Sequence, residues 1–146
     1  MTKIYIDADG CPVVDIVIKI AAKFGVEVYI ITDTSHYFDK PGATTITVSK
    51  GADSVDFALV NKVSNNDLVI TQDYGLAAMC LAKKTYVMHQ DGWMFDEKNI
   101  AGLLQSRHLA KKIRISGGRL RGPSKRTSAQ NDDFKNNLTK FLCNMP

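Results

Sequence analysis

The chain has 146 residues, 45% of them hydrophobic and 23% charged, which suits one domain and excludes a wholly disordered, collagen-like or coiled-coil chain. No apolar run approaches the roughly 20 residues that a membrane span needs, so we expect no membrane partner. The net charge of +4 combines two unlike parts: residues 1–106 hold 9 Lys and Arg against 13 Asp and Glu, whereas residues 107–126 hold 8 basic residues and no acid.

The first part of the chain alternates short β-rich runs with helical patterns. Residues 4–6 predict a strand, and apolar residues at helical spacing predict a helix over 13–24. Residues 26–31 predict a second strand with branched side chains on both faces. The polar stretch 32–45 is typical of a loop, and residues 46–48 predict a short third strand.

The same alternation continues to about residue 104. Apolar stripes predict helices over 53–63, 73–82 and 96–104, and short apolar runs predict strands over 68–70 and 86–88. Strands that are buried on both faces and separated by helices indicate an α/β fold with a mainly parallel sheet and right-handed crossovers.

The last third of the chain departs from this rhythm. Residues 107–126 contain three glycines, one proline and few apolar residues, which predicts a basic loop or arm. An apolar stripe over 132–142 predicts a helix, and the stripe needs cover, so we expect residues 127–146 to pack back onto the body. The predicted organisation is a single domain over residues 1–146, with an α/β body over 1–106.

The three cysteines are far apart and form no CxxC pair. Their odd number and spacing argue against a disulfide framework and against a zinc knuckle. The N-terminal segment carries two aspartates within its first ten residues, which is unlike a secretory signal peptide. Reduced thiols in a cytoplasmic protein are the natural expectation.

Aspartates gather where the predicted fold would place a ligand. Asp7 and Asp9 follow the first strand, Asp73 follows a later strand, and Asp53 and Asp56 open a helix. Ligands of open parallel sheets bind beyond the carboxyl ends of the strands. Neighbouring carboxylates bind protons or a cation, and Mg²⁺ and Mn²⁺ prefer oxygen ligands. The pattern therefore permits a metal site of the kind that activates water and shields a phosphodiester in a nuclease.

Several of these aspartates also have a purely structural explanation. Asp53 and Asp73 stand where an acid caps a helix. Asp33 and Asp91 stand in polar turns, where Asp is common, and for them we favour the structural role. Packing alone explains Asp7 and Asp9 least well, because Asp7 ends a buried strand and Asp9 follows it two residues later.

Four segments together resemble the YaiI/YqxD family of bacterial proteins, whose fold resembles that of PIN-like nucleases: IYIDADGCPV (4–13), ADSVDFALV (52–60), VITQDYGLA (69–77) and RGP (121–123). The resemblance covers essentially the whole chain. It implies a three-layer α/β/α sandwich with an acidic pocket at the strand ends. PIN-like nucleases hold Mg²⁺ or Mn²⁺ with several acids there and cut RNA or DNA.

The resemblance assigns roles by position. Asp7 matches the acid after the first strand, Asp73 matches the acid after a later central strand, and Asp53 or Asp56 matches the helical acid. Asp9 is a second acid of the opening block. The predicted catalytic residues are thus Asp7, Asp9, Asp56 and Asp73, and these four with Asp53 are the predicted metal ligands.

Three further residues in the matching blocks have two interpretations each. Cys11 is either reactive or a small group that turns the strand into the helix, and the second is simpler. Thr71 and Gln72 either contact a phosphate or orient a metal-bound water, or they only form the turn before Asp73.

The basic strip over 107–126 predicts a phosphate-binding arm. Guanidinium groups and main-chain N–H groups near glycines bind phosphates well, and the predicted contacts are Arg114, Arg119, Arg121, Lys125 and Arg126. The alternative is a solvated surface that balances the acidic body. Together with the acidic pocket, the strip favours a nucleic-acid partner, RNA before DNA, bound in a salt-dependent manner.

Three functions remain open. The preferred one is a divalent-metal-dependent nuclease that acts on RNA or single-stranded nucleic acid. The second is a protein that binds nucleic acid without cutting it. The third is a phosphatase of the haloacid dehalogenase kind, whose D-x-D-G block IYIDADGCPV also resembles, with Asp7 as nucleophile, Asp9 as acid and Thr32 as the hydroxyl residue. That superfamily's later pair of acids shrinks here to Asp73, which ranks the phosphatase lower.

Overall fold

A six-stranded sheet in the order β3-β2-β1-β4-β5-β6 forms the middle layer of the protein. The computed structural model describes residues 2–51, 53–118 and 124–145. The strands are β1 (Lys3–Asp7), β2 (Glu27–Asp33), β3 (Thr44–Val48), β4 (Leu68–Ile70), β5 (Tyr86–Met88) and β6 (Met94–Phe95). All neighbours are parallel except β5 and β6, so the predicted mainly parallel α/β sheet is confirmed.

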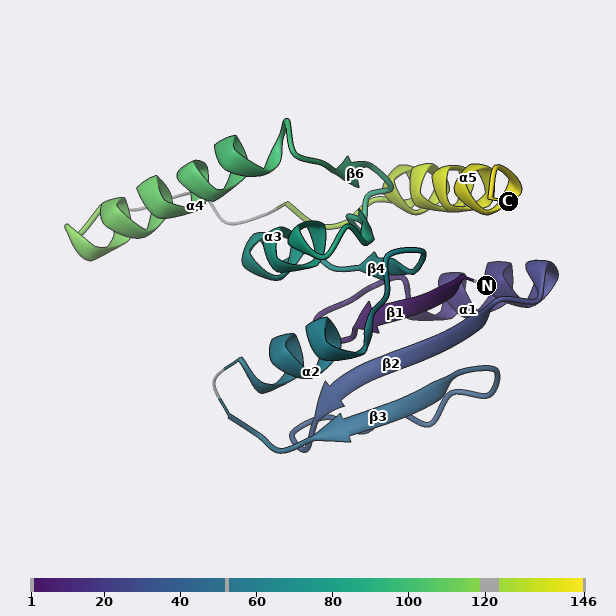
Figure 1. Ribbon diagram of the computed structural model, residues 1–146. Helices are drawn as coiled ribbons and strands as arrows, with labels where there is room; N and C mark the ends of the chain where they lie inside the picture. The colour runs from purple at the N-terminus through teal and green to yellow at the C-terminus, as the bar shows by residue number, and fades with distance from the viewer. Residues whose placement is uncertain (1, 52, 119–123, 146) are drawn as a thin grey trace.

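Helices cover both faces of this sheet (Figure 1). They are α1 (Val14–Phe24), α2 (Ser54–Lys62), α3 (Tyr74–Ala82), α4 (Ile100–Ile115) and α5 (Ser128–Cys143). Buried residues of α1 and α5 share one core with one face of the sheet, and those of α2 and α3 share a second core with the other face. The helices and the sheet therefore form three layers.

Alternation along the strands divides their side chains between the two cores. Ile4 and Ile6 of β1 belong to the core under α1 and α5, whereas Tyr5 between them belongs to the core under α2 and α3. Successive side chains of a strand point to opposite faces, so a strand buried on both sides needs apolar residues at every position. This requirement produces the unbroken apolar runs in the sequence.

The prediction of a loop over 107–126 is wrong for residues 107–115. The helix that we expected over 96–104 begins instead at Ile100 and continues to Ile115. Asp96 forms a turn before it, in which its Oδ1 accepts hydrogen bonds from the N–H groups of Lys98 and Asn99, each at 2.8 Å. Residues 107–115 include Leu, Ala, Lys and Arg, which favour helix, and no Gly or Pro occurs among them. Arg119 and Arg121 lie outside the described residues.

The C-terminal helix packs onto the body as expected. It begins at Ser128, four residues earlier than the predicted start, because Thr127 and Gln130 form a capping box. Phe134, Leu138 and Leu142 are buried in the core that α5 shares with α1. Among the described residues, no helix is long and apolar enough to cross a membrane.

Candidate active site: an acidic cleft faced by α4

A cleft of about 690 Å³ lies at the carboxyl ends of β1 and β2 and at the start of α2 and α3. Six aspartates line it: Asp7, Asp9, Asp33, Asp53, Asp56 and Asp73. The opposite wall comes from α4, which contributes Arg107 and Arg114. All five aspartates that the sequence predicts as metal ligands therefore line one cleft.

Thr71 connects the two acids that end neighbouring strands. Its Oγ1 donates a hydrogen bond to Asp7 Oδ2 at 2.8 Å and accepts one from the Asp73 N–H at 3.0 Å. Thr71 itself is only 2% exposed, whereas Asp7 and Asp73 are half-buried, so the connection is partly buried. Thr71 thus forms the turn before Asp73 and orients Asp7, and its contact with a phosphate or a metal-bound water stays a prediction.

Asp73 caps a helix and faces the cleft at the same time. Its Oδ1 accepts hydrogen bonds from the N–H groups of Gly75 at 2.8 Å and Leu76 at 3.2 Å, at the start of α3. Arg107 Nη1 lies 3.4 Å from the same oxygen. Among the described residues Oδ2 has no hydrogen-bond partner, so one carboxylate oxygen holds the helix and the other stays available.

Burial and mutual repulsion make two of the acids hold their protons unusually well. Burial raises the pKa of Asp7 to about 6; Asp73 and Asp9 add to the rise, and the hydrogen bond from Thr71 opposes it. Burial also raises the pKa of Asp56 to about 6, with further contributions from Asp73, Asp7 and Asp53 and an opposing one from Arg107. Asp7, Asp56 and Asp73 therefore act on one another as a cluster of excess negative charge.

Asp9 and Asp53 lie at the rim of the cleft. The Asp9 side chain is 76% exposed, and its Oδ1 lies 3.1 Å from His36 Nε2. Asp53 precedes α2 with φ 60° and makes no side-chain capping hydrogen bond, so the prediction that it caps this helix is wrong.

Gly10 has a positive φ of 66°, and a Cβ there would lie 3.2 Å from Gln72 Nε2. Glycine lets the turn after Asp9 pass close to Gln72, which is itself a lining residue.

The donor set suits a hard ion that keeps some of its water. In the described ranges, no three His, Cys, Asp or Glu side chains lie close enough to form a ready-made metal site. Mg²⁺ is commonly bound by one or two carboxylates together with water and substrate phosphates, and it does not require a closed protein cage. The carboxylate groups of Asp7 and Asp56 fit this way of binding Mg²⁺, because the charge of a cation would offset the repulsion between the two carboxylates.

One residue that lines the cleft carries a buried hydroxyl group without a partner in the described ranges. Thr32, at the end of β2, is 2% exposed and lines the cleft, and within the described part of the chain its Oγ1 has no hydrogen-bond partner. A buried hydroxyl group without a partner costs about 1–3 kcal/mol. Thr32 is therefore a buried polar group at the end of β2 whose hydrogen-bonding capacity is not satisfied by the described residues.

Arg107 belongs to the basic strip, but we did not select it from the sequence. It lines the cleft together with Ala110 and Arg114, at positions i, i+3 and i+7 of α4. That spacing places the three residues on one face of a helix. This spacing can be seen in the sequence, but it places the side chains on one face only if residues 107–115 form a helix.

Arg126, one of the predicted phosphate contacts, connects two parts of the fold. Its Nη1 lies 2.7 Å from Asp91 Oδ1, its Nη2 donates to the Gln90 carbonyl at 2.7 Å, and its Nε donates to Asn131 Oδ1 at 2.7 Å. The guanidinium thus ties the turn after β5 to the start of α5. Neither Arg126 nor the exposed Lys125 lines the cleft.

The two structural turns that we expected are present, and Cys11 behaves as a packing residue. Asp91 pairs with Arg126, and Asp33 accepts a hydrogen bond from the Ser35 N–H at 2.8 Å, although Asp33 also lines the cleft. Burial raises the pKa of the half-buried Cys11 thiol to about 11. The thiol is therefore protonated at neutral pH and a poor nucleophile.

Comparison with known proteins gives one consistent result. Residues 5–144 match the family described as Uncharacterized BCR, YaiI/YqxD family. A "UPF0178 protein" of Exiguobacterium sibiricum is 49% identical over 140 residues, which cover 96% of each chain. Another, of Natranaerobius thermophilus, is 46% identical over 143 residues, which cover 98% of this chain and 97% of the relative. No solved structure matches the chain.

Proposed function

The chain belongs to the YaiI/YqxD family, and we propose that it is a divalent-metal-dependent nuclease that cuts RNA or single-stranded nucleic acid in the acidic cleft. The observation that carries the proposal is the coupling of Asp7, Asp56 and Asp73 in a cleft whose facing wall holds Arg107 and Arg114. The carboxylates of the cleft would attract a cation, and the guanidinium groups of the two arginines would attract an anion. A phosphodiester with its metal ion satisfies both requirements.

In this proposal each acid has a role that follows from its surroundings in the cleft. When bound, Mg²⁺ or Mn²⁺ supplies Lewis-acid polarisation of the phosphate and a water of lowered pKa. Asp7 and Asp56 would hold the ion, and Thr71 would keep Asp7 in position through its hydrogen bond. Asp73 would use its free Oδ2, and Asp9 would bind at the rim beside His36.

Two basic residues of α4 would hold the substrate. Arg107 and Arg114 would contact consecutive phosphates, because phosphate contacts position a nucleic acid without reading its sequence. Gln72, which is exposed and lines the cleft, would hydrogen-bond the same strand. The acids at the strand ends fit the acidic pocket that the resemblance to PIN-like nucleases implies, which supports the same proposal.

A direct test uses one substitution and one matched control. Purified protein with Mn²⁺ should cut a single-stranded RNA, and Asp7→Asn should remove at least about 99% of the rate, a loss that is common when a metal-binding or catalytic group is removed. Asp132→Asn, at an exposed position of α5, should keep full activity. Full activity in Asp7→Asn would refute the mechanism. Binding without cleavage at any metal concentration would establish the non-catalytic alternative.

A phosphatase of the haloacid dehalogenase kind is a second candidate because of one observation, the unpartnered hydroxyl of Thr32 beside the Asp7 strand. Asp7 would be the nucleophile and Thr32 would bind the phosphoryl group. Against it, the later pair of acids of that superfamily is represented in the cleft by Asp73, and the positive charge in the lining comes from arginines of α4. Beryllofluoride separates the two candidates, since only an aspartyl-phosphate enzyme should bind it stoichiometrically at Asp7.

A further inference from the structure

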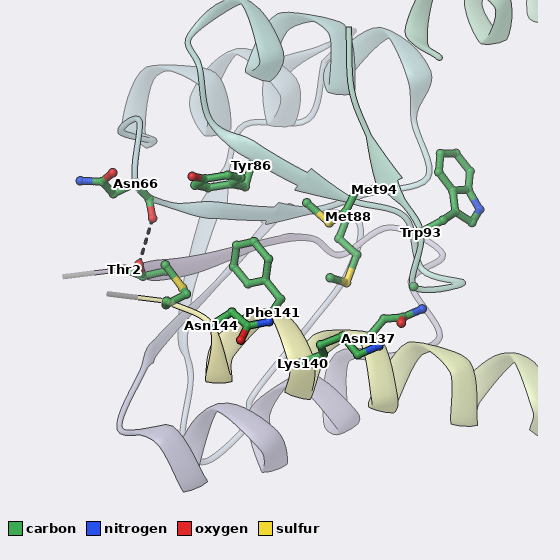
Figure 2. A pocket seen from close by; sticks show the side chains of 12 residues that line it. Thr2, Asn66, Tyr86, Met88, Trp93, Met94, Asn137, Lys140, Phe141 and Asn144 are labelled. Atoms are coloured by element: carbon green, nitrogen blue, oxygen red, sulfur yellow. Dashed lines mark hydrogen bonds between the residues drawn. The ribbon is translucent and has the colours of Figure 1, made fainter. Parts of the chain in front are cut away.

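A second cavity, of about 760 Å³, lies between the β5–β6 edge of the sheet and α5 (Figure 2). Its lining residues come from the start of β1 and the turn before β4, from β5 and β6, and from the last turns of α5. It shares no lining residue with the acidic cleft. The proposed nuclease function makes no use of it.

The walls of this cavity are aromatic and sulfur-rich. Tyr86 and Phe141 meet edge to face, with ring centroids 5.3 Å apart and planes at 72°. Met88 and Met94 extend from the sheet toward α5 in Figure 2, and Met145 also lines the space. Methionine side chains adapt to irregular ligands and make favourable contacts with aromatic rings.

The polar groups of the cavity lie on its rim, and the one charged group among them is positive. Lys140 is the only charged side chain in the lining, and among the described residues it makes no ion pair. Asn137 of α5 and Asn144, just after its end, also line the cavity, as does Asn66, whose side chain extends outward in Figure 2. The side-chain amides of these asparagines have no hydrogen-bond partner within the described ranges. The rim therefore offers several free donors and one cation, and no acid.

The wall between β5 and β6 is fixed before any ligand binds. Gly92 has φ 96°, and a Cβ there would lie 2.8 Å from Asn137 Nδ2 and 2.9 Å from the Asp133 carbonyl oxygen. His89 stacks on Trp93 with ring centroids 4.4 Å apart. Arg126 holds the same turn to the start of α5 through Asp91 and Asn131. A preformed site loses little entropy on binding.

We propose that this cavity binds a small amphipathic anion, a flat aromatic ring system that carries one carboxylate, phosphate or sulfonate group. The ring would lie among Tyr86, Phe141 and the methionines, and the acidic group would pair with Lys140. The volume lies within the range of about 300–1,000 Å³ that drug-sized ligands occupy. Apolar walls with a few converging polar groups are typical of such sites.

Anilinonaphthalene sulfonate is a suitable probe, because it combines two aromatic ring systems with one sulfonate. Trp93 lines the cavity and is the only tryptophan of the chain, so a dye bound there should quench Trp93 emission by energy transfer. We expect one saturable site per chain. Lys140→Met should weaken the dye by about three- to ten-fold, the loss of one partly exposed ion pair. Lys135→Met, on the same helix but outside the lining, should leave the affinity unchanged.

A neutral dye and two further variants separate the role of Lys140 from that of the apolar walls. Phenylnaphthylamine, the same ring system without the sulfonate, should bind wild type and Lys140→Met equally, because its contacts are with the apolar walls. Asn144→Phe should fill the opening and abolish binding of both dyes, with an unchanged circular dichroism spectrum as the check on folding. Ile115→Ser, at a 76% exposed residue of α4, should have no effect.

Several outcomes would overturn the proposal. They are a dye that binds without quenching Trp93, an equal loss in Lys140→Met and Lys135→Met, or a loss of binding in Ile115→Ser. Loss of neutral-dye binding in Lys140→Met would contradict the assigned pairing of Lys140 with the acidic group. None of these results depends on whether the acidic cleft cuts nucleic acid.

Discussion

Thr71, just after β4, and Asp7, at the end of β1, lie 64 positions apart in the chain and meet through a partly buried hydrogen bond of 2.8 Å. This bond opposes the rise in the pKa of Asp7 that burial causes. Thr71→Val should keep the shape of the side chain and remove the donor, so the pKa of Asp7 should rise above its value of about 6. Carbon-detected NMR titration of the Asp7 carboxyl would measure it. An unchanged or lower pKa would show that the hydrogen bond does not stabilise the carboxylate.

The contribution of Asp7 and Asp56 to stability should fall as pH rises through the acidic range. The folded-state pKa values of Asp7 and Asp56 are about 6, above the ordinary value of 3.8, so the folded protein binds more protons than the unfolded chain between those values. Linkage then requires the contribution of these groups to fall from about pH 4 to about pH 6 and to stay low above it. Asp56→Asn should raise the Tm at pH 7 by a few degrees, and the gain should vanish below about pH 4. Thermal unfolding at fixed ionic strength measures both, with Asp132→Asn as the control that should show no gain.

Divalent ions should stabilise the protein through the same residues. At saturating Mn²⁺ the Tm of the wild type should rise, because a ligand that binds only the folded state shifts the folding equilibrium. The shift should be absent in the double variant Asp7→Asn/Asp56→Asn. Isothermal titration calorimetry would give the affinity directly. An equal shift in the double variant would place the ion elsewhere.

The two arginines of α4 should control how binding of single-stranded RNA depends on salt. Arg107→Ala and Arg114→Ala should each reduce the slope of log K against log salt by about 0.7, the value for one phosphate contact on a single strand. Lys111→Ala lies on the same helix but outside the cleft lining, and it should leave the slope unchanged. Fluorescence anisotropy at several salt concentrations would show the difference. Equal slopes for all three variants would assign the effect to general surface charge.

Arg126→Met should destabilise the fold without changing the cleft. It removes an ion pair with Asp91 and two more hydrogen bonds of 2.7 Å from a side chain that is 19% exposed. Loss of such a network should cost about 2–4 kcal/mol in the free energy of unfolding. Lys125→Met, at the exposed neighbour, should stay within about 0.5 kcal/mol of wild type. Urea unfolding of both variants would measure the difference, and equal stabilities would contradict the assigned role.

The sheet and its acids could be predicted from the sequence because burial on both faces leaves a continuous signal. Apolar residues at every strand position, as at Ile4, Tyr5 and Ile6, identify the parallel strands, and the strand ends then place Asp7 and Asp73. No residue of α4 is buried, so its C-terminal half leaves no apolar stripe in the sequence, and the glycines and the proline that follow it predict a loop there instead. The two-residue strand β6 is too short to leave a period of its own.

Other features depend on distant parts of the chain and have no local pattern. The free hydroxyl of Thr32 follows from what its neighbours fail to supply, which no spacing rule reveals. The cavity beside α5 joins residues near 86–94 with residues near 137–145. In the sequence Tyr86 and Phe141 look like ordinary core residues. Only the contact between their rings in the fold forms a wall of the cavity.

The helix that carries Arg107 and Arg114 packs chiefly on α3 and buries none of its residues. The acids, by contrast, follow strands at the centre of the sheet, whose amides are shielded by two cores. Elements with few buried contacts open locally long before the whole domain unfolds. Amides of α4 should therefore exchange with deuterium much faster than those of β1 and β4. On warming, the cleft should lose its basic wall first and keep its acidic wall until the domain melts.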